Sequence, residues 1–187
     1  MKTYQITEWC HETFKLMARE KGIYIDATMG NGHDTLFLCE MAGEDGKVFA
    51  FDIQEQALEA TRELLCRNQM EDRAELFLES HTNMKEHVKE NTVDGIVFNF
   101  GYLPGGDHNL ATKAESSLKA IEDGLSLLNK GGVISLCIYS GGDTGFEERD
   151  QILQLLKHLD GKKYIVIRSE YFNRENDPPM PVLIIKK

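Results

Sequence analysis

The chain has 187 residues, of which 41% are apolar and 4 are prolines, so we expect one globular domain with a sizeable core rather than two domains. The net charge of −10 argues against a surface that binds nucleic acid everywhere, although residues 149–187 carry 8 basic and 5 acidic side chains and should face any polyanion. No apolar run approaches the roughly 20 residues that span a bilayer, and the start lacks a signal-peptide core, which predicts a cytoplasmic protein without a membrane segment.

Helical and strand patterns alternate along most of the chain. An amphipathic helix over 8–19 comes first, stops at Gly22 and should pack at the sheet edge. The alternation that follows predicts parallel strands joined by helical crossovers. Strands are expected at 23–27, 47–52, 74–78, 93–99 and 133–139. Helices are expected at 34–42, 55–68, 83–89, 112–128 and 146–158, with residues 129–132 as a connection.

The last part of the chain lacks this alternation of helices and strands. Two apolar stretches, 164–168 and 182–185, are separated by a polar loop that contains Pro178 and Pro179 and leaves no helix-length spacer. They should form an antiparallel hairpin at the sheet edge. The predicted fold class is therefore α/β, with a mostly parallel sheet of about seven strands, an antiparallel C-terminal hairpin and helices on both faces.

The cysteines and histidines predict neither disulfides nor a metal site. No cysteine pair has CxxC spacing, and no His or Cys pair has the close spacing of a zinc site. Buried, reduced thiols are the expected state. The four cysteines are Cys10, Cys39, Cys66 and Cys137.

The loop after the first predicted strand is the most informative stretch of the sequence. It reads DATMGNGHDT over residues 26–35, and Gly30 and Gly32 would let the backbone turn tightly and approach a ligand before a helix begins. The next predicted strand ends at Asp52, 22 residues after Gly30, where a carboxylate would meet ribose hydroxyls. Together these features indicate a nucleotide-containing cofactor.

Two cofactors fit this arrangement, NAD and S-adenosyl-L-methionine (SAM). An acidic residue after the second strand serves either of them. The loop reads GxGxxT, with Thr35 in place of the third glycine of the dinucleotide fingerprint, which favours SAM. Asp26 ends the first strand, where a carboxylate can organise the loop near the methionine amino group of SAM. The antiparallel tail also fits a seven-stranded methyltransferase sheet.

Four motifs carry a resemblance to a known family. They are DATMGNGHDT at 26–35, FDIQ at 51–54, SHTNM at 80–84 and NFGYLPGGDH at 99–108. Together they resemble the small class I methyltransferases of the putative rRNA methylase family, and the similarity runs from about His11 to Lys187. The resemblance implies a Rossmann-like fold, SAM as donor and a tRNA anticodon arm as partner, with methylation of 5-aminomethyl-2-thiouridine at the wobble position.

One segment departs from the family pattern. After Tyr139 members often carry histidines in a Tyr-His-Gly-His-like stretch, whereas this chain has Ser140, Gly141, Gly142 and Asp143. No role of those histidines can be carried over to this chain.

The predicted cofactor-binding residues follow the first three strands. Asp52 is expected to bind the ribose hydroxyls, and Gln54 the adenosine part, although a solvated acid and a helix start would explain them too. Ser80 and His81 are expected near the adenine, with a surface histidine as the alternative. The full predicted set is Asp26, Thr28, Gly30, Asn31, Gly32, Thr35, Asp52, Gln54, Ser80 and His81.

The candidate catalytic residues lie in the segment that starts at Asn99. This segment occupies the place where amino-methylating enzymes carry an Asn-Pro-Pro-Tyr-like motif. Asn99 could accept hydrogen bonds from the acceptor amine, and Asp107 could take the proton that the amine must lose before transfer. Tyr102 could stack on the uridine or orient the amine. A Gly-Gly-Asp turn and a core tyrosine are the structural alternatives.

The predicted substrate contacts lie near strand ends in the basic tail. A wobble base in a single-stranded loop is bound by aromatic stacking and edge hydrogen bonds. The residues expected to supply them are Tyr139, Phe172, Asn173, Arg174 and Asn176, although ordinary hairpin-loop composition would explain the same residues. Other acceptors, rRNA or a small molecule, and a non-catalytic SAM-binding protein remain as alternatives. A homodimer would help so small an enzyme to span an RNA arm.

Overall fold

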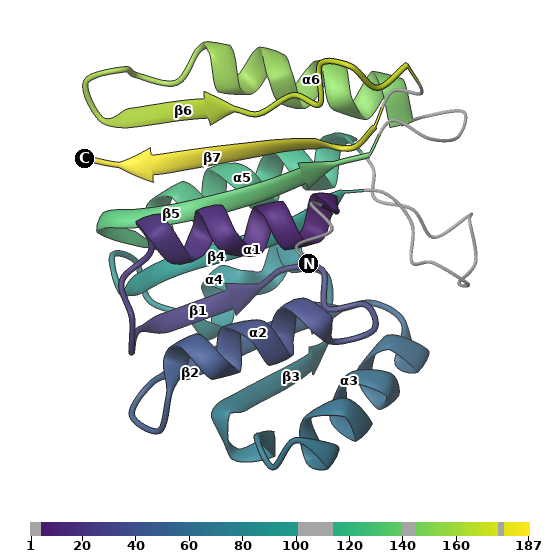
Figure 1. Cartoon of the computed structure of the whole chain (residues 1–187). Helices are drawn as coiled ribbons and strands as arrows, with labels where there is room; N and C mark the ends of the chain where they lie inside the picture. Colours follow the sequence, from purple (N-terminus) through teal and green to yellow (C-terminus); the bar gives the residue numbers. More distant parts are fainter. Residues whose placement is uncertain (1–4, 101–113, 140–144, 176–177) are drawn as a thin grey trace.

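The computed structural model describes residues 5–100, 114–139, 145–175 and 178–187. In this part of the chain a seven-stranded sheet runs in the order β3-β2-β1-β4-β5-β7-β6 (Figure 1). The strands are β1 (Ile23–Asp26), β2 (Lys47–Asp52), β3 (Ala74–Leu78), β4 (Val93–Phe100), β5 (Leu128–Ile138), β6 (Tyr164–Arg168) and β7 (Met180–Lys186). The helices are α1 (Ile6–Met17), α2 (His33–Ala42), α3 (Glu55–Arg67), α4 (Met84–His87), α5 (Ala114–Leu127) and α6 (Gly145–Lys157).

The pairing of the strands confirms the predicted topology. Strands β1 to β5 are parallel to one another, and β7 is antiparallel to both β5 and β6. The predicted hairpin of β6 and β7 therefore forms, with β7 between β5 and β6 and with β6 at the edge of the sheet. Because β5 and β6 are both antiparallel to β7, they run in the same direction, and their carboxyl ends lie at the same edge as those of β1, β2 and β4.

Two clusters of apolar side chains cover the two faces of the sheet. Successive strand residues point to opposite faces, so Tyr24 and Val97 join one cluster while Ile25 and Ile96 join the other. Helices α1, α2 and α3 supply the first cluster, and α4, α5 and α6 the second. Helices on both faces were predicted, and this arrangement confirms them.

Three details differ from the predictions. Helix α1 packs over β5 and β7 on a face of the sheet rather than at its edge, because its buried Phe14 joins the cluster between the helices and the strands. The expected connection at 129–132 lies within β5, where the register against β4 shifts and Gly131 takes a φ of 83°. Cys66 is exposed, whereas the other three cysteines are buried as expected.

The described helices give no membrane segment. None of them is long and apolar enough to cross a bilayer.

Gly95 of β4 makes room for the docking of α1. A Cβ at this position would lie 2.3 Å from Cζ of Phe14, which is itself 1% exposed and has no space to move into. We therefore expect Gly95→Ala to lower the free energy of unfolding by about 1–3 kcal/mol, measured by urea denaturation. Gly161→Ala is the control, because no atom lies within 4 Å of a Cβ there. Equal stability of both variants would contradict this account of the α1 contact.

Candidate active site

The carboxyl ends of β1, β2 and β4 bring three predicted site residues to one edge of the sheet. Asp26 ends β1, Asp52 ends β2, and Asn99 precedes the last residue of β4. The chain runs outward in one direction through β2 and β3 and in the other through β4 and β5, so β1 and β4 flank the point where the strand order reverses. Open α/β sheets bind ligands at this point.

The loop between β1 and α2 is held in a conformation that needs glycine. Gly30 and Gly32 have φ values of 53° and 80°, in the left-handed region. A Cβ on Gly32 would also lie 2.7 Å from Oγ1 of Thr61, and that hydroxyl donates to the carbonyl of Gly30 at 3.2 Å. Asn31 between them is exposed. Thr61, a buried residue of α3, was not predicted, because its contact with the loop depends on tertiary packing.

The carboxyl group of Asp26 is fully buried and organises this loop through two hydrogen bonds. Its Oδ2 accepts a hydrogen bond from Oγ1 of Thr35 at 2.6 Å, and its Oδ1 accepts one from the backbone N–H of Thr28 at 3.2 Å. Burial, and then the negative charge of Asp34, raise the pKa of Asp26 to about 7. Asp26 therefore connects the end of β1 to the start of α2 and brings together three of the residues predicted for the cofactor site.

Asp52 connects the end of β2 to the same loop. Its Oδ2 accepts from the backbone N–H of Gly30 at 3.0 Å, and its Oδ1 accepts from the backbone N–H of Gln54 at 3.0 Å. An ionised carboxylate offers about four acceptor positions, so each oxygen keeps one for a hydroxyl. The carboxylate is partly exposed and can be reached by a ligand. Gln54 is the N-cap residue of α3, and the role of its side chain stays a prediction.

The residues after β3 have different environments. Ser80 caps a short 3-10 turn, His81–Asn83, by accepting from the backbone N–H of Thr82 at 3.2 Å. The alternative of a surface histidine is wrong, because His81 is buried and faces Phe98 and Phe100 edge-on. Burial lowers the pKa of His81, so it is neutral, and its Nε2 has no hydrogen-bond partner among the described residues.

A second network, which was not predicted, lies on the other side of the loop. Asp34 accepts from Nδ2 of Asn99 and bonds to Nε2 of His11, both at 2.5 Å. Burial raises the pKa of Asp34, but the hydrogen bond and charge of His11 and the amide of Asn99 outweigh it, so the pKa is lowered. The backbone N–H of Asn99 donates to Oγ1 of Thr28 at 2.7 Å. The only sequence signal was that Asp34 belongs to the quoted loop motif.

The predicted substrate contacts are divided between described and undescribed residues. Tyr139 follows β5 and is partly buried, and burial raises its pKa. Phe172, Asn173 and Arg174 are exposed in the segment after β6, which ends at the same edge of the sheet as β5. The predicted residues Tyr102, Asp107 and Asn176 lie outside the described residues. The segment 140–143, which departs from the family pattern, lies outside them as well.

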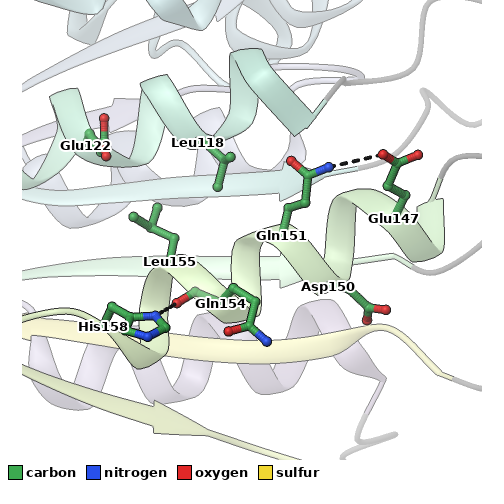
Figure 2. Close-up of a pocket in the computed structure, with 8 residues that line it drawn as sticks. All are labelled: Leu118, Glu122, Glu147, Asp150, Gln151, Gln154, Leu155 and His158. Atoms are coloured by element: carbon green, nitrogen blue, oxygen red, sulfur yellow. Dashed lines mark hydrogen bonds between the residues drawn. The ribbon is translucent and has the colours of Figure 1, made fainter.

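A groove of about 700 Å³ lies between α5 and α6 (Figure 2). Its lining includes Leu118 and Leu155 with the acidic side chains of Glu122, Glu147 and Asp150. None of the predicted site residues lines it. We therefore take the carboxyl ends of β1, β2 and β4 as the candidate site, because Asp26, Asp52 and Asn99 come together there.

Solved structures with the same fold identify the cofactor. The chain matches a putative methyltransferase from Streptococcus mutans in complex with SAH, with 35% identity, a TM-score of 0.88 and full coverage of both chains. It also matches a putative rRNA-methylase from Clostridium thermocellum, with 40% identity, a TM-score of 0.95 and full coverage of both chains. The fold and these matches define a Rossmann-like, SAM-dependent methyltransferase. The alternatives of an NAD enzyme and of a non-catalytic protein are therefore wrong.

The family follows from the sequence itself. Residues 48–185 match the family described as "Putative rRNA methylase", and the chain belongs to this family. A tRNA (mnm(5)s(2)U34)-methyltransferase, chloroplastic, from Arabidopsis thaliana is 35% identical over 187 residues, covering 95% of this chain and 67% of that protein. A ribosomal RNA small subunit methyltransferase H from Wolbachia sp. subsp. Drosophila simulans is 33% identical over 121 residues, which span 61% of this chain and 40% of that protein.

The raised pKa of Asp26 predicts how stability depends on pH. The native state holds this proton up to about pH 7, whereas an unfolded aspartate loses it near pH 4. The native state therefore binds more protons between these values, and the free energy of unfolding should fall as the pH rises through this window. We expect a fall of roughly 1–3 kcal/mol between pH 5 and pH 7.5 in the free protein, relative to Asp26→Asn, by urea denaturation. Parallel profiles for the two proteins would contradict a protonated, buried Asp26.

Proposed function

We propose that this enzyme transfers a methyl group from SAM to the exocyclic amine of 5-aminomethyl-2-thiouridine at the wobble position of tRNA. The observation that carries the acceptor assignment is the similarity over 95% of the chain to the Arabidopsis tRNA methyltransferase. The geometry agrees with an amine acceptor, because an amide side chain, that of Asn99, lies at the carboxyl end of β4 beside the cofactor loop.

The residues at the sheet edge fit SAM. Asp52 would bind the ribose hydroxyls with the acceptor positions that the backbone N–H groups leave open. The backbone of Gly30 and Gly32, where no Cβ intervenes, would lie along the methionine end, with Asp26 holding the loop beneath it. The buried ring of His81 would lie on the adenine side. When bound, SAM supplies an electrophilic methyl group on a sulfonium sulfur.

The acceptor side must bind the amine in its neutral form. An alkylamine is mostly protonated near neutral pH and then has no lone pair, so the site has to favour loss of one proton. Asn99 would accept a hydrogen bond from one of the two N–H groups that remain and hold the nitrogen in line for displacement. Asp107 remains the proposed proton acceptor and Tyr102 the proposed partner of the base.

The anticodon arm would contact the segment after β6. Phe172 is 92% exposed, so it can stack on a base at little cost in protein packing. Arg174 follows in the more basic part of the chain and would meet a phosphate. Tyr139, Asn173 and Asn176 complete the proposed contacts.

We also propose that the chain acts as one methyltransferase domain. The homodimer stays a prediction.

A second candidate acceptor is rRNA, which the family description and the rRNA methyltransferase relatives favour. Methylation of tRNA and methylation of rRNA would use the same SAM site, and the two proposals differ in which RNA is the substrate. A direct comparison of the two substrates therefore separates them.

Substitution of Asp52 tests the cofactor site. Asp52→Asn removes the charge and one of the two backbone contacts, and hydrogen bonds to charged groups contribute about 1.5–3 kcal/mol each. We expect SAM to bind at least about tenfold more weakly in isothermal titration calorimetry. Glu59→Gln is the control, because Glu59 is exposed on α3 and belongs to no proposed contact. Unchanged affinity in a folded Asp52→Asn protein would exclude the proposed ribose site.

Nucleoside mass spectrometry tests the reaction and the acceptor together. The wild type and Asn99→Ala are incubated with SAM and tRNA that carries 5-aminomethyl-2-thiouridine, with rRNA in parallel. We expect the wobble nucleoside to gain one methyl group with the wild type, at least about tenfold more slowly with the variant, because the amine loses its hydrogen-bond acceptor. Methylation of rRNA without methylation of tRNA would overturn the proposed acceptor and leave the enzyme class intact.

A further inference from the structure

Three side chains from three separate elements form a continuous line beside the proposed acceptor position. His11 comes from α1, Asp34 from the first turn of α2 and Asn99 from the end of β4. Nε2 of His11 lies 2.5 Å from Oδ1 of Asp34, and Nδ2 of Asn99 lies 2.5 Å from Oδ2 of the same carboxylate. Each carboxylate oxygen thus has a different partner, and Asp34 links the histidine to the asparagine.

The ring of His11 is held in place by packing. It stacks on Phe37 of α2, with the ring centroids 3.9 Å apart and the planes 5° from parallel. Phe37 is buried and meets Phe14 of α1 edge-on. Helices α1 and α2 therefore fix both the plane and the position of the imidazole, with its Nε2 edge toward Asp34.

The charge of Asp34 determines which way the amide of Asn99 faces. An ionised carboxylate can only accept hydrogen bonds, so the NH₂ group of Asn99 must face Asp34. The amide oxygen then points away from Asp34. The backbone N–H of the same residue donates to Oγ1 of Thr28, so backbone and side chain are both held.

From this geometry we infer that His11 and Asp34 are a positioning pair, which fixes the amide of Asn99 with its oxygen turned toward the N–H groups of the acceptor amine. The inference rests on the proposed methylation of an amine. Neither His11 nor Asp34 needs to touch the substrate, because both act through Asn99.

His11 is needed because Asp34 is nearly buried. The side chain of Asp34 is 12% exposed, and burial alone would raise its pKa and favour the protonated form. A protonated carboxyl group can donate, and it would then bond equally well to the oxygen of Asn99. The amide of Asn99 could then rotate by a half turn and present its NH₂ group to the amine, where it would donate to the lone pair that has to attack the methyl group. The donor on His11 prevents this reversal by keeping the carboxylate ionised.

Two substitutions of His11 separate the donor from the stacked ring. His11→Phe keeps a ring on Phe37 and removes the donor, whereas His11→Gln keeps an N–H donor near the position of Nε2 and removes the ring. We expect kcat for tRNA methylation to fall about tenfold or more in His11→Phe, with KM for tRNA and the Kd of SAM within about twofold of the wild type. We expect His11→Gln to recover most of the lost kcat.

A second readout follows the asparagine itself in the free protein. With ¹⁵N-labelled asparagine, the side-chain amide of Asn99 is assigned by its absence from the spectrum of Asn99→Ala. We expect one of its protons to lie downfield and to exchange slowly in the wild type and His11→Gln, and to lose both properties in His11→Phe. His11→Leu, a smaller donor-free side chain, replaces His11→Phe if that variant does not fold.

The outcomes separate this inference from the proposed function. A wild type that methylates no tRNA would refute the proposed acceptor, and the amide spectra would still decide on the positioning pair. An active wild type whose donor-free variant keeps its kcat or its Asn99 amide signal would overturn the inference. Loss of kcat in His11→Gln with retention in His11→Phe would assign His11 a packing role and overturn it as well.

Discussion

The hydrogen bonds of the buried carboxyl group of Asp26 are the interactions on which the rest of the site depends. It holds the hydroxyl of Thr35 at the start of α2 and the backbone of Thr28 at the end of β1, so it fixes both ends of the cofactor loop. Thr28 in turn accepts from the backbone of Asn99, which connects the loop to the acceptor side. A substitution of Asp26 would therefore alter the structure of both the donor side and the acceptor side of the site.

Three aspartates within one edge of the sheet have three different environments. Asp26 is fully buried and its pKa is raised, whereas the pKa of Asp34 is lowered by His11 and Asn99. Asp52 is partly exposed and bonded to two backbone N–H groups, with acceptor positions left for a ligand. The same type of side chain thus organises the loop at Asp26, forms the centre of a side-chain network at Asp34 and is the proposed ribose ligand at Asp52, and the burial and partners of each determine its role.

The sequence predicted the sheet well because its strands are apolar, short and separated by regular helical patterns. The cofactor loop could also be predicted, since glycines before a helix and an acid at the end of the next strand have a local signature. The shift in β5 could not, because Gly131 and Gly132 read as a turn and form an irregular part of a strand. The packing of His81 on Phe100 joins residues 19 apart in the chain, and the contact of His11 with Asp34 joins residues 23 apart. No local sequence pattern predicts contacts of this kind.

The most direct test of the account is a crystal structure of the enzyme with S-adenosylhomocysteine. We expect the ribose hydroxyls to lie within hydrogen-bond distance of Asp52, the homocysteine part to follow the backbone of Gly30 and Gly32, and the sulfur to face Asn99. The ligand at another edge of the sheet, or in the groove between α5 and α6, would contradict the assignment of the carboxyl ends of β1, β2 and β4 as the active site.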